Sequence, residues 1–264
     1  MLKIENVRKV FNAGTINEKV ALNGLNLELK KGDFVTVIGG NGAGKSTMLN
    51  SVAGVYPVDE GKILIDGVDV TGLPEFKRAK FIGRVFQDPM MGTAATMQIE
   101  ENLALAARRG KTRTLRSGIT KQEREEYREK LKILDLGLED RMTAKVGLLS
   151  GGQRQALTLL MATLQEPKLL LLDEHTAALD PKTAAKVLEA TQRIVERSNL
   201  TTMMITHNMR DAIAYGNRLI MMYNGHVVVD VSGEEKKNLT VEQLLNLFSQ
   251  ASGSDEVNDK LLLS

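Results

Sequence analysis

The stretch FVTVIGGNGAGKSTMLNSVAGV, from Phe34 to Val55, decides the fold class of this 264-residue chain. Its first five residues are apolar or β-branched, as in a buried strand, and they run directly into glycines. The residues STMLNSVAGV then have the composition of a helix that closes near Gly54. A strand, a glycine-rich loop and a helix in this order predict an α/β fold with an anion site at the helix start.

The loop fits the pattern G-x-x-x-x-G-K-[ST], the phosphate-binding loop of P-loop NTPases. Glycines let the backbone curl so that successive N–H groups point at one anion, and the helix start adds partial positive charge. Lys45 should reach the β- and γ-phosphates, and the Ser46 hydroxyl should ligate Mg²⁺. The predicted nucleotide-binding residues are Gly39, Asn41, Gly42, Ala43, Gly44, Lys45, Ser46 and Thr47.

A second apolar run, LLLLDE, ends in the adjacent carboxylates Asp173 and Glu174. In phosphate-loop enzymes, a carboxylate at the end of a neighbouring buried strand holds Mg²⁺, and Asp173 fits this role. Glu174 follows at once, where it could polarise the attacking water. Without the phosphate loop, the pair would be interpreted as a solvated turn. Because an N-K-x-D guanine-reading motif is missing, the sequence favours ATP over GTP.

Composition limits the other functions. With 42% hydrophobic and 26% charged residues, the chain can form an ordinary core, and its net charge of +2 argues against nucleic-acid binding driven by overall charge. The absence of cysteine excludes disulfides and thiolate metal sites. The start, MLKIENVRKV, lacks the apolar core of a signal peptide, and no apolar run approaches the ~18–20 residues that span a bilayer. Any membrane role would depend on a partner.

The remaining pattern predicts how the chain is organised. Residues 2–11 and 20–33 have strand character, and hairpins are expected at Asp66-Gly67 and Asn224-Gly225. The run KLLLLD, the helix TAAKVLEATQRIVERS and the strand LTTMMITH predict a β-α-β unit. A capping box of Thr240 and Gln243 should open the last helix.

Between about Met91 and Leu138 the sequence becomes polar and helical. It includes a basic stretch, which is either a solvated face or a site that approaches phospholipid headgroups or an acidic partner loop. The basic residues are Arg108, Arg109, Lys111, Arg113, Arg116, Lys121 and Arg124.

Leu149 to Gln155 read LSGGQRQ, and a helical run follows, so Ser150 begins a second helix N-terminus suited to an anion. A plain helix cap is the alternative. With the phosphate loop and the segment LLLLDEHTAALD, this motif resembles the ATP-binding subunits of ABC transporters, to about Leu247.

The resemblance implies an ABC-type P-loop NTPase core with an antiparallel β subdomain and a helical signature subdomain. The ATPase domain would cover residues 1–248, with the core and β subdomain at about 1–90 and 160–235 and the helical subdomain at about 91–159. Residues 249–264 are expected to form a flexible tail.

The resemblance also assigns roles to residues. Two such domains close head to tail on two ATP molecules, so that Ser150, Gly151, Gly152 and Gln153 of one protomer cap the ATP of the other. Asp180 would line the dimer contact, and Gln87 would sense the metal or the water and couple the core to the membrane subunit. His207 would contact the γ-phosphate, and Phe11 would stack on adenine, unless it is a core residue. The expected catalytic residues are Glu174, His207, Gln87 and Lys45, and the expected metal ligands are Ser46, Gln87 and Asp173.

His175 departs from the pattern, because proline is usual after the catalytic glutamate. Metal binding is disfavoured, since no other histidine or cysteine lies nearby and Mg²⁺ prefers oxygen ligands. A tolerated helix-start residue and a contact near Asp180 both remain open. The segment DEHTAALDPKTA resembles a subgroup of bacterial importer ATPases, some linked to uptake of aromatic amino acids such as tryptophan or tyrosine.

The resemblance therefore implies a Mg²⁺-dependent ATPase that works as a homodimer on the cytoplasmic face of the membrane. Its expected partners are two membrane-spanning permease subunits and an extracytoplasmic substrate-binding protein, with no nucleic acid. The alternatives are an exporter or lipoprotein-release ATPase, or a soluble ABC-fold protein of the DNA-repair, translation or iron–sulfur type. The single motif set and the absence of a long insertion disfavour the repair and translation types.

Overall fold

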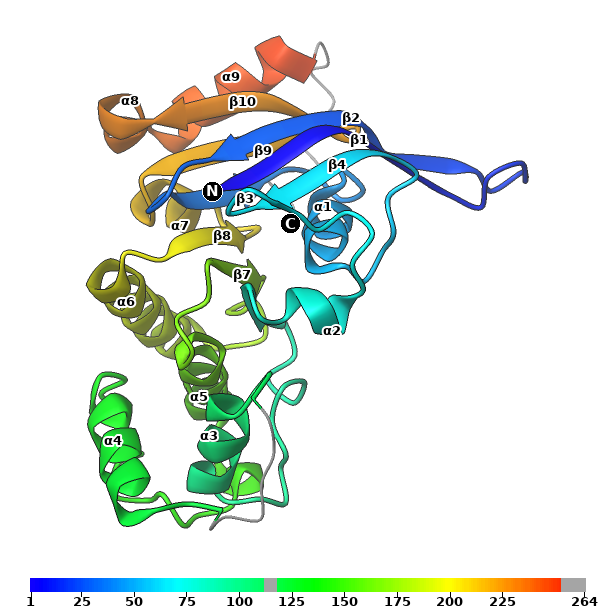
Figure 1. The fold of residues 1–264 in the computed structure, drawn as a ribbon. Helices are drawn as coiled ribbons and strands as arrows, with labels where there is room; N and C mark the ends of the chain where they lie inside the picture. The colour runs from blue at the N-terminus through cyan, green and yellow to red at the C-terminus, as the bar shows by residue number, and fades with distance from the viewer. Residues whose placement is uncertain (112–117, 253–264) are drawn as a thin grey trace. The chain divides into compact units, whose positions relative to one another are not determined.

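The structure, a computed structural model, describes residues 1–111 and 118–252 (Figure 1). The chain forms compact units, one from Met1–Ile82 with Thr201–Ser264 and the other from Gly83–Leu200. The division into subdomains expected from the sequence stays a prediction. Of the expected tail, residues 253–264 lie outside the described residues, whereas 249–252 continue the last helix.

An antiparallel sheet in the first unit contains the chain start. Its strands lie in the order β2-β1-β4-β5, and every neighbouring pair is antiparallel. The predicted hairpin at Asp66-Gly67 is confirmed, because both residues have positive φ (53° and 80°), as a tight two-residue turn requires. The strands are β1 (Leu2–Phe11), β2 (Lys19–Leu29), β4 (Glu60–Ile65) and β5 (Val68–Asp69).

The strand before the glycine-rich loop lies in a mixed sheet of the same unit. β3 (Phe34–Ile38) is buried along its whole length and pairs in parallel with β8 (Thr201–Ile205) and β9 (Arg218–Tyr223). β10 (His226–Ser232) is antiparallel to β9, and the predicted turn at Asn224-Gly225 joins them. Both faces of β3 are covered, which explains its unbroken apolar sequence.

Helices complete the first unit (Figure 1). Helix α1 (Lys45–Ala53) ends where Gly54 adopts φ 88°, as expected for a glycine after a helix. The predicted capping box opens α9, since the N–H of Gln243 donates to Thr240 Oγ1 (3.2 Å) and the N–H of Thr240 donates to Gln243 Oε1 (2.9 Å). The other helices are α2 (Glu75–Arg78), α7 (Met209–Ala214), α8 (Gly233–Lys237) and α9 (Val241–Ser252).

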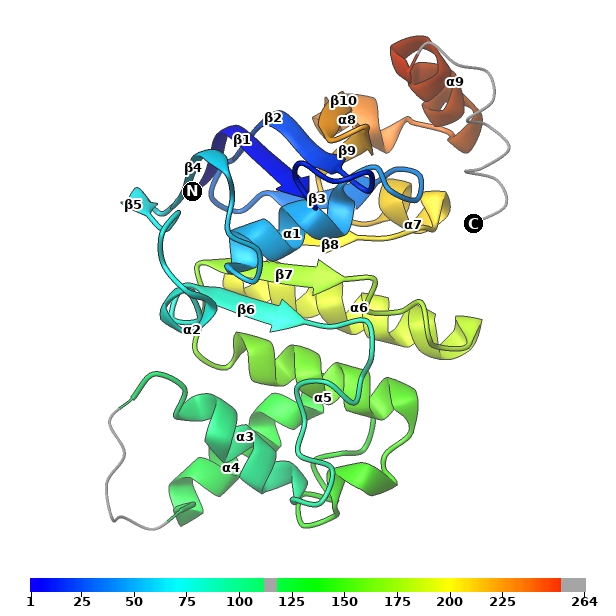
Figure 2. The same ribbon diagram turned by 90° about the vertical axis from the view of Figure 1, so that its right-hand side faces the viewer.

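The second unit combines two strands with helices, and Figure 2 shows β6 (Ile82–Val85) beside β7 (Leu169–Asp173). β7 is the predicted LLLLD strand. Its helices are α3 (Ile99–Ala107), α4 (Lys121–Lys132), α5 (Gly151–Thr163) and α6 (Pro181–Ser198), with a short 3₁₀ turn at Val146–Leu148. The expected β-α-β elements are β7, α6 and β8.

Part of the basic stretch is paired within this unit. Arg108 Nη2 lies 2.8 Å from Glu123 Oε1, and Arg124 makes two bonds to the Glu100 carboxylate, at 2.7 and 2.9 Å. For these two residues, the charge is therefore paired between helices of the same unit, and the choice between a solvated face and a site for headgroups or an acidic loop stays a prediction. Arg113 and Arg116 lie outside the described residues.

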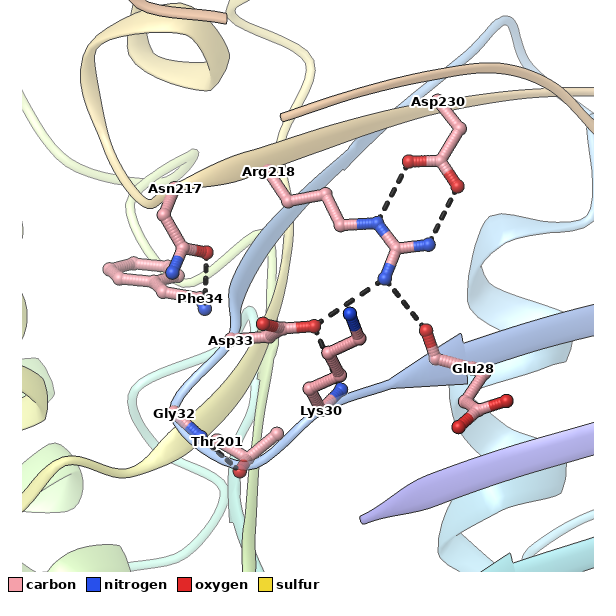
Figure 3. Close-up of polar contacts among 9 residues, drawn as sticks. All are labelled: Glu28, Lys30, Gly32, Asp33, Phe34, Thr201, Asn217, Arg218 and Asp230. Carbon is pink, nitrogen blue, oxygen red and sulfur yellow. Dashed lines mark hydrogen bonds and ion pairs between the residues drawn. The ribbon is translucent and has the colours of Figure 1, made fainter. Parts of the chain in front are cut away.

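Arg218, at the start of β9, joins the two sheets of the first unit (Figure 3). Its guanidinium makes bonds of 2.8 and 2.6 Å to the Asp230 carboxylate in β10. Its Nη1 donates to the carbonyl of Glu28 in β2 (2.7 Å) and lies 3.4 Å from Asp33 Oδ2. Charge-assisted bonds in this fork geometry are strong, and they hold β2 against the mixed sheet.

The same strand, β2, packs against the glycine-rich loop through the backbone of Ala21. A methyl group built on Gly44 would lie 2.6 Å from the carbonyl oxygen of Ala21, and one built on Gly225 would lie 2.8 Å from the same oxygen. The N–H of Gly225 also donates to the carbonyl of Ala43 (3.0 Å). Three backbone segments therefore meet where only glycine leaves enough room.

Within the described residues, none of the helices combines the length and apolar character required to cross a membrane.

Replacing Gly225 with alanine should therefore disturb the glycine-rich loop, although Gly225 lies far from that loop in the sequence. The new methyl group would force the β9–β10 turn away from Ala21 and from the loop. We expect a loss of about 1–3 kcal/mol in the free energy of unfolding, measured by urea denaturation, together with weaker nucleotide binding, measured by calorimetry.

Gly67→Ala is the matched control. Gly67 occupies the second position of a similar turn with φ 80°, but an added methyl group there meets no atom within 4 Å. This variant reports only the cost of alanine at positive φ and should leave nucleotide binding unchanged. Equal effects of the two variants on nucleotide binding would contradict the supporting role of Gly225.

Candidate functional site

The phosphate loop, residues 39–46, follows β3 and runs into the first turn of α1 in the first unit, as predicted. Its three glycines with positive φ are Gly39 (148°), Gly42 (81°) and Gly44 (102°), so its course is closed to residues with a side chain. Lys45 is buried, and its Nζ donates to the carbonyls of Gly39 (2.6 Å) and Gly40 (3.2 Å). The loop thus carries a fixed cation beside the N-terminus of α1, an arrangement that favours a bound phosphate group.

The same unit contains the expected switch histidine and the expected adenine-stacking residue. His207 follows β8 and is half-buried, just before Asn208, whose side chain caps α7 by accepting from Arg210 and Asp211. Phe11 is the last residue of β1 and is also half-buried.

The environment of Phe11 keeps part of its ring accessible. It makes an edge-to-face contact with Tyr56, with ring centroids 5.3 Å apart, and the Lys9 ammonium lies 5.6 Å from its centroid. A half-buried aromatic ring can stack on a base through its exposed part, and the role of Phe11 as adenine contact stays a prediction.

In the second unit, β7 delivers the two carboxylates. Asp173 is half-buried at the end of the strand, and Arg84 Nη2 of the neighbouring β6 lies 3.4 Å from its Oδ2. Glu174 follows with φ 46°, a left-handed conformation that is uncommon for a residue with a side chain. Its carbonyl accepts from the N–H of Ala177 (3.0 Å), so the chain turns sharply directly after β7. Backbone strain of this kind is concentrated at functional sites.

The LSGGQ motif forms a helix start in this unit. Ser150 is the N-cap of α5: its Oγ accepts from the N–H of Gln153 (3.3 Å), and Gln153 Oε1 accepts from the N–H of Ser150 (3.2 Å). This capping box uses a lone pair of the serine oxygen and leaves the hydroxyl proton for another acceptor. The cap and the anion site, which the sequence presents as alternatives, are therefore compatible.

The two glycines of the motif pack against the start of α6. A methyl group on Gly152 would overlap the side chain of Thr183, and one on Gly151 would lie 3.4 Å from Leu179. The N–H of Thr183 in turn donates to Asp180 Oδ1 (3.1 Å), which caps α6. Hydrogen bonding from the Thr183 side chain, and then from its backbone, holds the pKa of Asp180 below its ordinary value. Asp180 is thus ionised at a helix N-terminus beside the signature motif.

Gln87 lies two residues after β6 and is exposed. The residue before it is fixed, because buried Gln155 of the LSGGQRQ motif donates from Nε2 to the carbonyl of Phe86 (2.8 Å). The signature helix and the segment carrying Gln87 are therefore connected directly within the second unit.

His175 is buried, with 2% of its surface exposed. Its Nε2 lies 3.1 Å from Thr191 Oγ1 in α6, and that hydroxyl donates its own proton to the carbonyl of Val187 (2.8 Å). Since the only proton of the hydroxyl is used, Thr191 must accept from a protonated Nε2. Burial lowers the pKa of His175 to about 4, so the ring is neutral at physiological pH and ties the segment after Glu174 to α6.

The structure overturns one of the two interpretations that the sequence leaves open for His175. The residue lies in the turn between β7 and α6, and α6 begins only at Pro181, so His175 is not a helix-start residue. Its buried ring packs against α6 and pairs with Thr191, and a contact near Asp180 stays a prediction. A general-base role has no support from this geometry.

The burial of His175 predicts a pH-dependent contribution to stability. Between pH 6.5 and about 4, the unfolded state binds a proton at His175 that the folded state does not bind, so stability is lost as pH falls through this window. Relative to His175→Gln, the wild type should lose about 2 kcal/mol of unfolding free energy between pH 7.5 and pH 5.0. Urea denaturation at pH 7.5, 6.0 and 5.0 would measure the difference. A difference between the two proteins that is constant over these pH values would contradict the burial of a neutral ring.

The predicted site residues thus fall into two groups, each held within one unit. The phosphate loop, Phe11 and His207 belong to the first, and the second contains Gln87, Asp173, Glu174, Asp180 and the signature motif. Sequence reasoning missed Gly225 and Thr191. A glycine in a hairpin turn and a threonine within a helix are both common, so neither residue is distinctive in the sequence. Their roles become visible only when the fold brings Gly225 to Gly44 and Thr191 to His175.

Comparison with known proteins points to the same motifs. The ABC transporter family profile matches residues 22–177. The tyrosine transport ATP-binding protein of Clostridioides difficile is 45% identical over 95% of this chain and 100% of its own length. The phosphonates import ATP-binding protein PhnC of Lactobacillus acidophilus is 32% identical over 93% of this chain and 95% of its own length.

The fold is likewise that of known ATP-binding cassettes. The dimeric cassette MJ0796 bound to ADP and Pi superimposes with a TM-score of 0.74 at 32% identity, covering 88% of this chain and 98% of its own. CbiO1 of Clostridium perfringens, part of the transporter complex cbiONQ, gives a TM-score of 0.76 at 25% identity, with 94% of each chain covered.

The predicted α/β P-loop fold of the ABC type is therefore confirmed, and with it the predicted binding of ATP or ADP. The chain belongs to the ABC transporter family, as an ATP-binding subunit that hydrolyses ATP to drive transport.

Proposed function

We propose that this chain energises a bacterial importer of tyrosine or a closely related aromatic amino acid, working through separate permease subunits. The supporting observation is the 45% identity to a tyrosine transport ATP-binding protein, which extends over the whole of that protein. The DEHTAALD segment, by which this chain departs from the common proline, points to the same subgroup. A phosphonate importer is the second candidate, because several relatives at 30–35% identity carry that name.

Residues of the first unit hold the nucleotide. The phosphate loop, with Lys45 and Thr47, binds the phosphates, Phe11 stacks on the adenine and His207 contacts the γ-phosphate. The loop glycines direct backbone N–H groups at the anion, and the buried Lys45 ammonium adds a full positive charge.

The donors that the sequence offers to Mg²⁺ suit that ion. Ser46 supplies a hydroxyl, Gln87 an amide oxygen and Asp173 a carboxylate, and Mg²⁺ prefers such oxygen ligands. When bound, Mg²⁺ neutralises phosphate charge. Arg84 Nη2 lies 3.4 Å from Asp173 Oδ2, and this ion pair helps to position the carboxylate at the end of β7.

Glu174 is the general base. It directly follows the metal-side carboxylate, and the left-handed turn at its own backbone fixes the direction in which its side chain leaves β7. A carboxylate so placed takes the proton of the attacking water. Gln87 positions that water or the metal, and Gln155 holds the backbone beside it.

The active form is a head-to-tail homodimer. The start of α5 is exposed at Ser150 and Gly151, with the serine proton available, and it presents an anion site that the chain's own phosphate loop does not need. Solved relatives such as MJ0796 are dimeric. Ser150, Gly151, Gly152 and Gln153 would thus cap the partner's ATP, with Asp180 at the contact. Two permease subunits and an extracytoplasmic binding protein would complete the transporter at the cytoplasmic face of the membrane.

Glu174→Gln should separate binding from turnover. The amide keeps the size of the carboxylate but cannot accept the proton, so we expect hydrolysis to fall by about 10²–10³-fold while ATP binding stays within about threefold. The variant should also accumulate as a dimer with MgATP in size-exclusion chromatography.

Glu189→Gln, at an exposed position on α6, is the control and should hydrolyse ATP like the wild type. Wild-type turnover by Glu174→Gln would show that another group is the base. Loss of MgATP binding would show that Glu174 holds the nucleotide instead.

Transport in the native host tests the substrate. Cells that lack this chain should lose high-affinity uptake of labelled L-tyrosine, and the wild-type chain should restore it, whereas Glu174→Gln should not, because transport requires turnover. Uptake of labelled methylphosphonate is measured in the same cells. If methylphosphonate uptake depends on this chain and tyrosine uptake does not, the phosphonate candidate replaces the amino-acid candidate.

A further inference from the structure

Lys19 stands beside the phosphate loop, although it lies 20 residues or more before it in sequence. A methyl group built on Gly42, in the middle of the loop, would lie 3.3 Å from Lys19 Nζ. Both residues are exposed, so solvent reaches the ammonium group beside the loop. No motif in the sequence marks this lysine.

The fold fixes Lys19 in this place through strand pairing. Lys19 is the first residue of β2 and pairs with Phe11, the last residue of β1. Two and three residues further along β2, Ala21 and Leu22 touch Gly44 of the loop. The start of β2 is therefore held by two contacts. Lys19 pairs with Phe11, the residue proposed to stack on adenine, and Ala21 and Leu22 pack against the loop.

The carboxylate next to Lys19 in sequence has a partner of its own. Glu18, the preceding residue, turns back to accept from the N–H of Gly14 (2.7 Å) within the β1–β2 turn. Lys45, the other cation of the loop, donates to the carbonyls of Gly39 and Gly40. Two lysines from different segments of the first unit, Lys45 in the loop and Lys19 in β2, therefore lie at this loop.

We propose that Lys19 is a second cationic contact for the nucleotide and binds its phosphate chain from the β2 side of the loop. An ammonium ion within a few ångströms of a polyphosphate is strongly attracted to it, and a flexible four-carbon side chain can move from the loop surface to the ligand. The phosphates are favoured over adenine, because Lys19 touches the loop backbone whereas Phe11 already offers a ring to the base. This inference rests on the proposed role of the phosphate loop.

The test compares Lys19→Met, Lys19→Arg and Lys31→Met. Methionine keeps the length of the side chain and removes its charge, and arginine restores the charge. Lys31 is another exposed lysine, in the β2–β3 turn, and serves as the control. Calorimetry gives the Kd of MgATP, MgADP and adenosine at two salt concentrations, and steady-state hydrolysis gives kcat and KM.

We expect Lys19→Met to raise the Kd of both MgATP and MgADP by about 3- to 30-fold, with kcat within twofold and adenosine binding unchanged. The salt dependence of MgATP binding should become shallower, because one ionic contact is lost. Lys19→Arg should bind like the wild type within about threefold, and Lys31→Met should be indistinguishable from it.

Two results would overturn the inference. Wild-type Kd values for Lys19→Met would show that the lysine does not contact the nucleotide. An equal loss of adenosine binding would place the contact on the base or ribose. Because Lys19 is exposed, its variants should melt within about 2 °C of the wild type, and Lys19→Gln replaces Lys19→Met if they do not. Failure of the wild type to bind MgATP would instead refute the proposed role of the loop.

Discussion

The contact of the Ala21 carbonyl with Gly44 and Gly225 is the constraint on which the rest of the first unit depends. A phosphate loop works only if its backbone N–H groups are held in one arrangement before the ligand arrives, because ordering them at binding would cost affinity. Here strand β2 of the antiparallel sheet and the β9–β10 turn of the mixed sheet pack against the loop. Two glycines allow this approach, and Arg218 locks the strand in place by bonds to Glu28 and Asp230.

In the second unit, a single helix, α6, holds several of the predicted site residues in place. The start of α6 packs under the signature glycines through Thr183 and carries Asp180 as its cap, and its third turn holds His175 through Thr191. The residue after Glu174 is therefore fixed to the same helix that supports the signature motif. A shift of α6 would therefore move both the residue after the proposed general base, Glu174, and the proposed dimer contact, Asp180.

His175 illustrates how a departure from a family pattern can be conservative in physical terms. Proline at this position would restrict the backbone through its ring, whereas histidine restricts it through burial and one hydrogen bond to Thr191. The cost is a buried ionisable group, which is tolerated because the ring stays neutral over the physiological pH range.

Much of the fold was predictable because its signals are local. Hairpins at Asp66-Gly67 and Asn224-Gly225 need positive φ at two adjacent positions, and the helix end at Gly54 needs the same at one, so these residues mark the turns wherever they occur. The apolar runs that became β3 and β7 were recognisable as buried strands by their lack of alternation. The order of motifs from Gly39 to His207 was enough to indicate the ABC transporter family.

What the sequence by itself determined is therefore the set of residues whose chemistry depends on their immediate neighbours: the phosphate loop, the carboxylate pair and the capped signature helix. Only the tertiary structure decided which distant residues support them. Lys19 lies near Gly42 because the pairing of β1 with β2 sets it opposite Phe11. Gly225 supports Gly44 because two sheets meet at Ala21, and His175 is neutral because the fold buries it. Such contacts are made between segments far apart in the chain, and no short-range pattern encodes the register or packing that creates them.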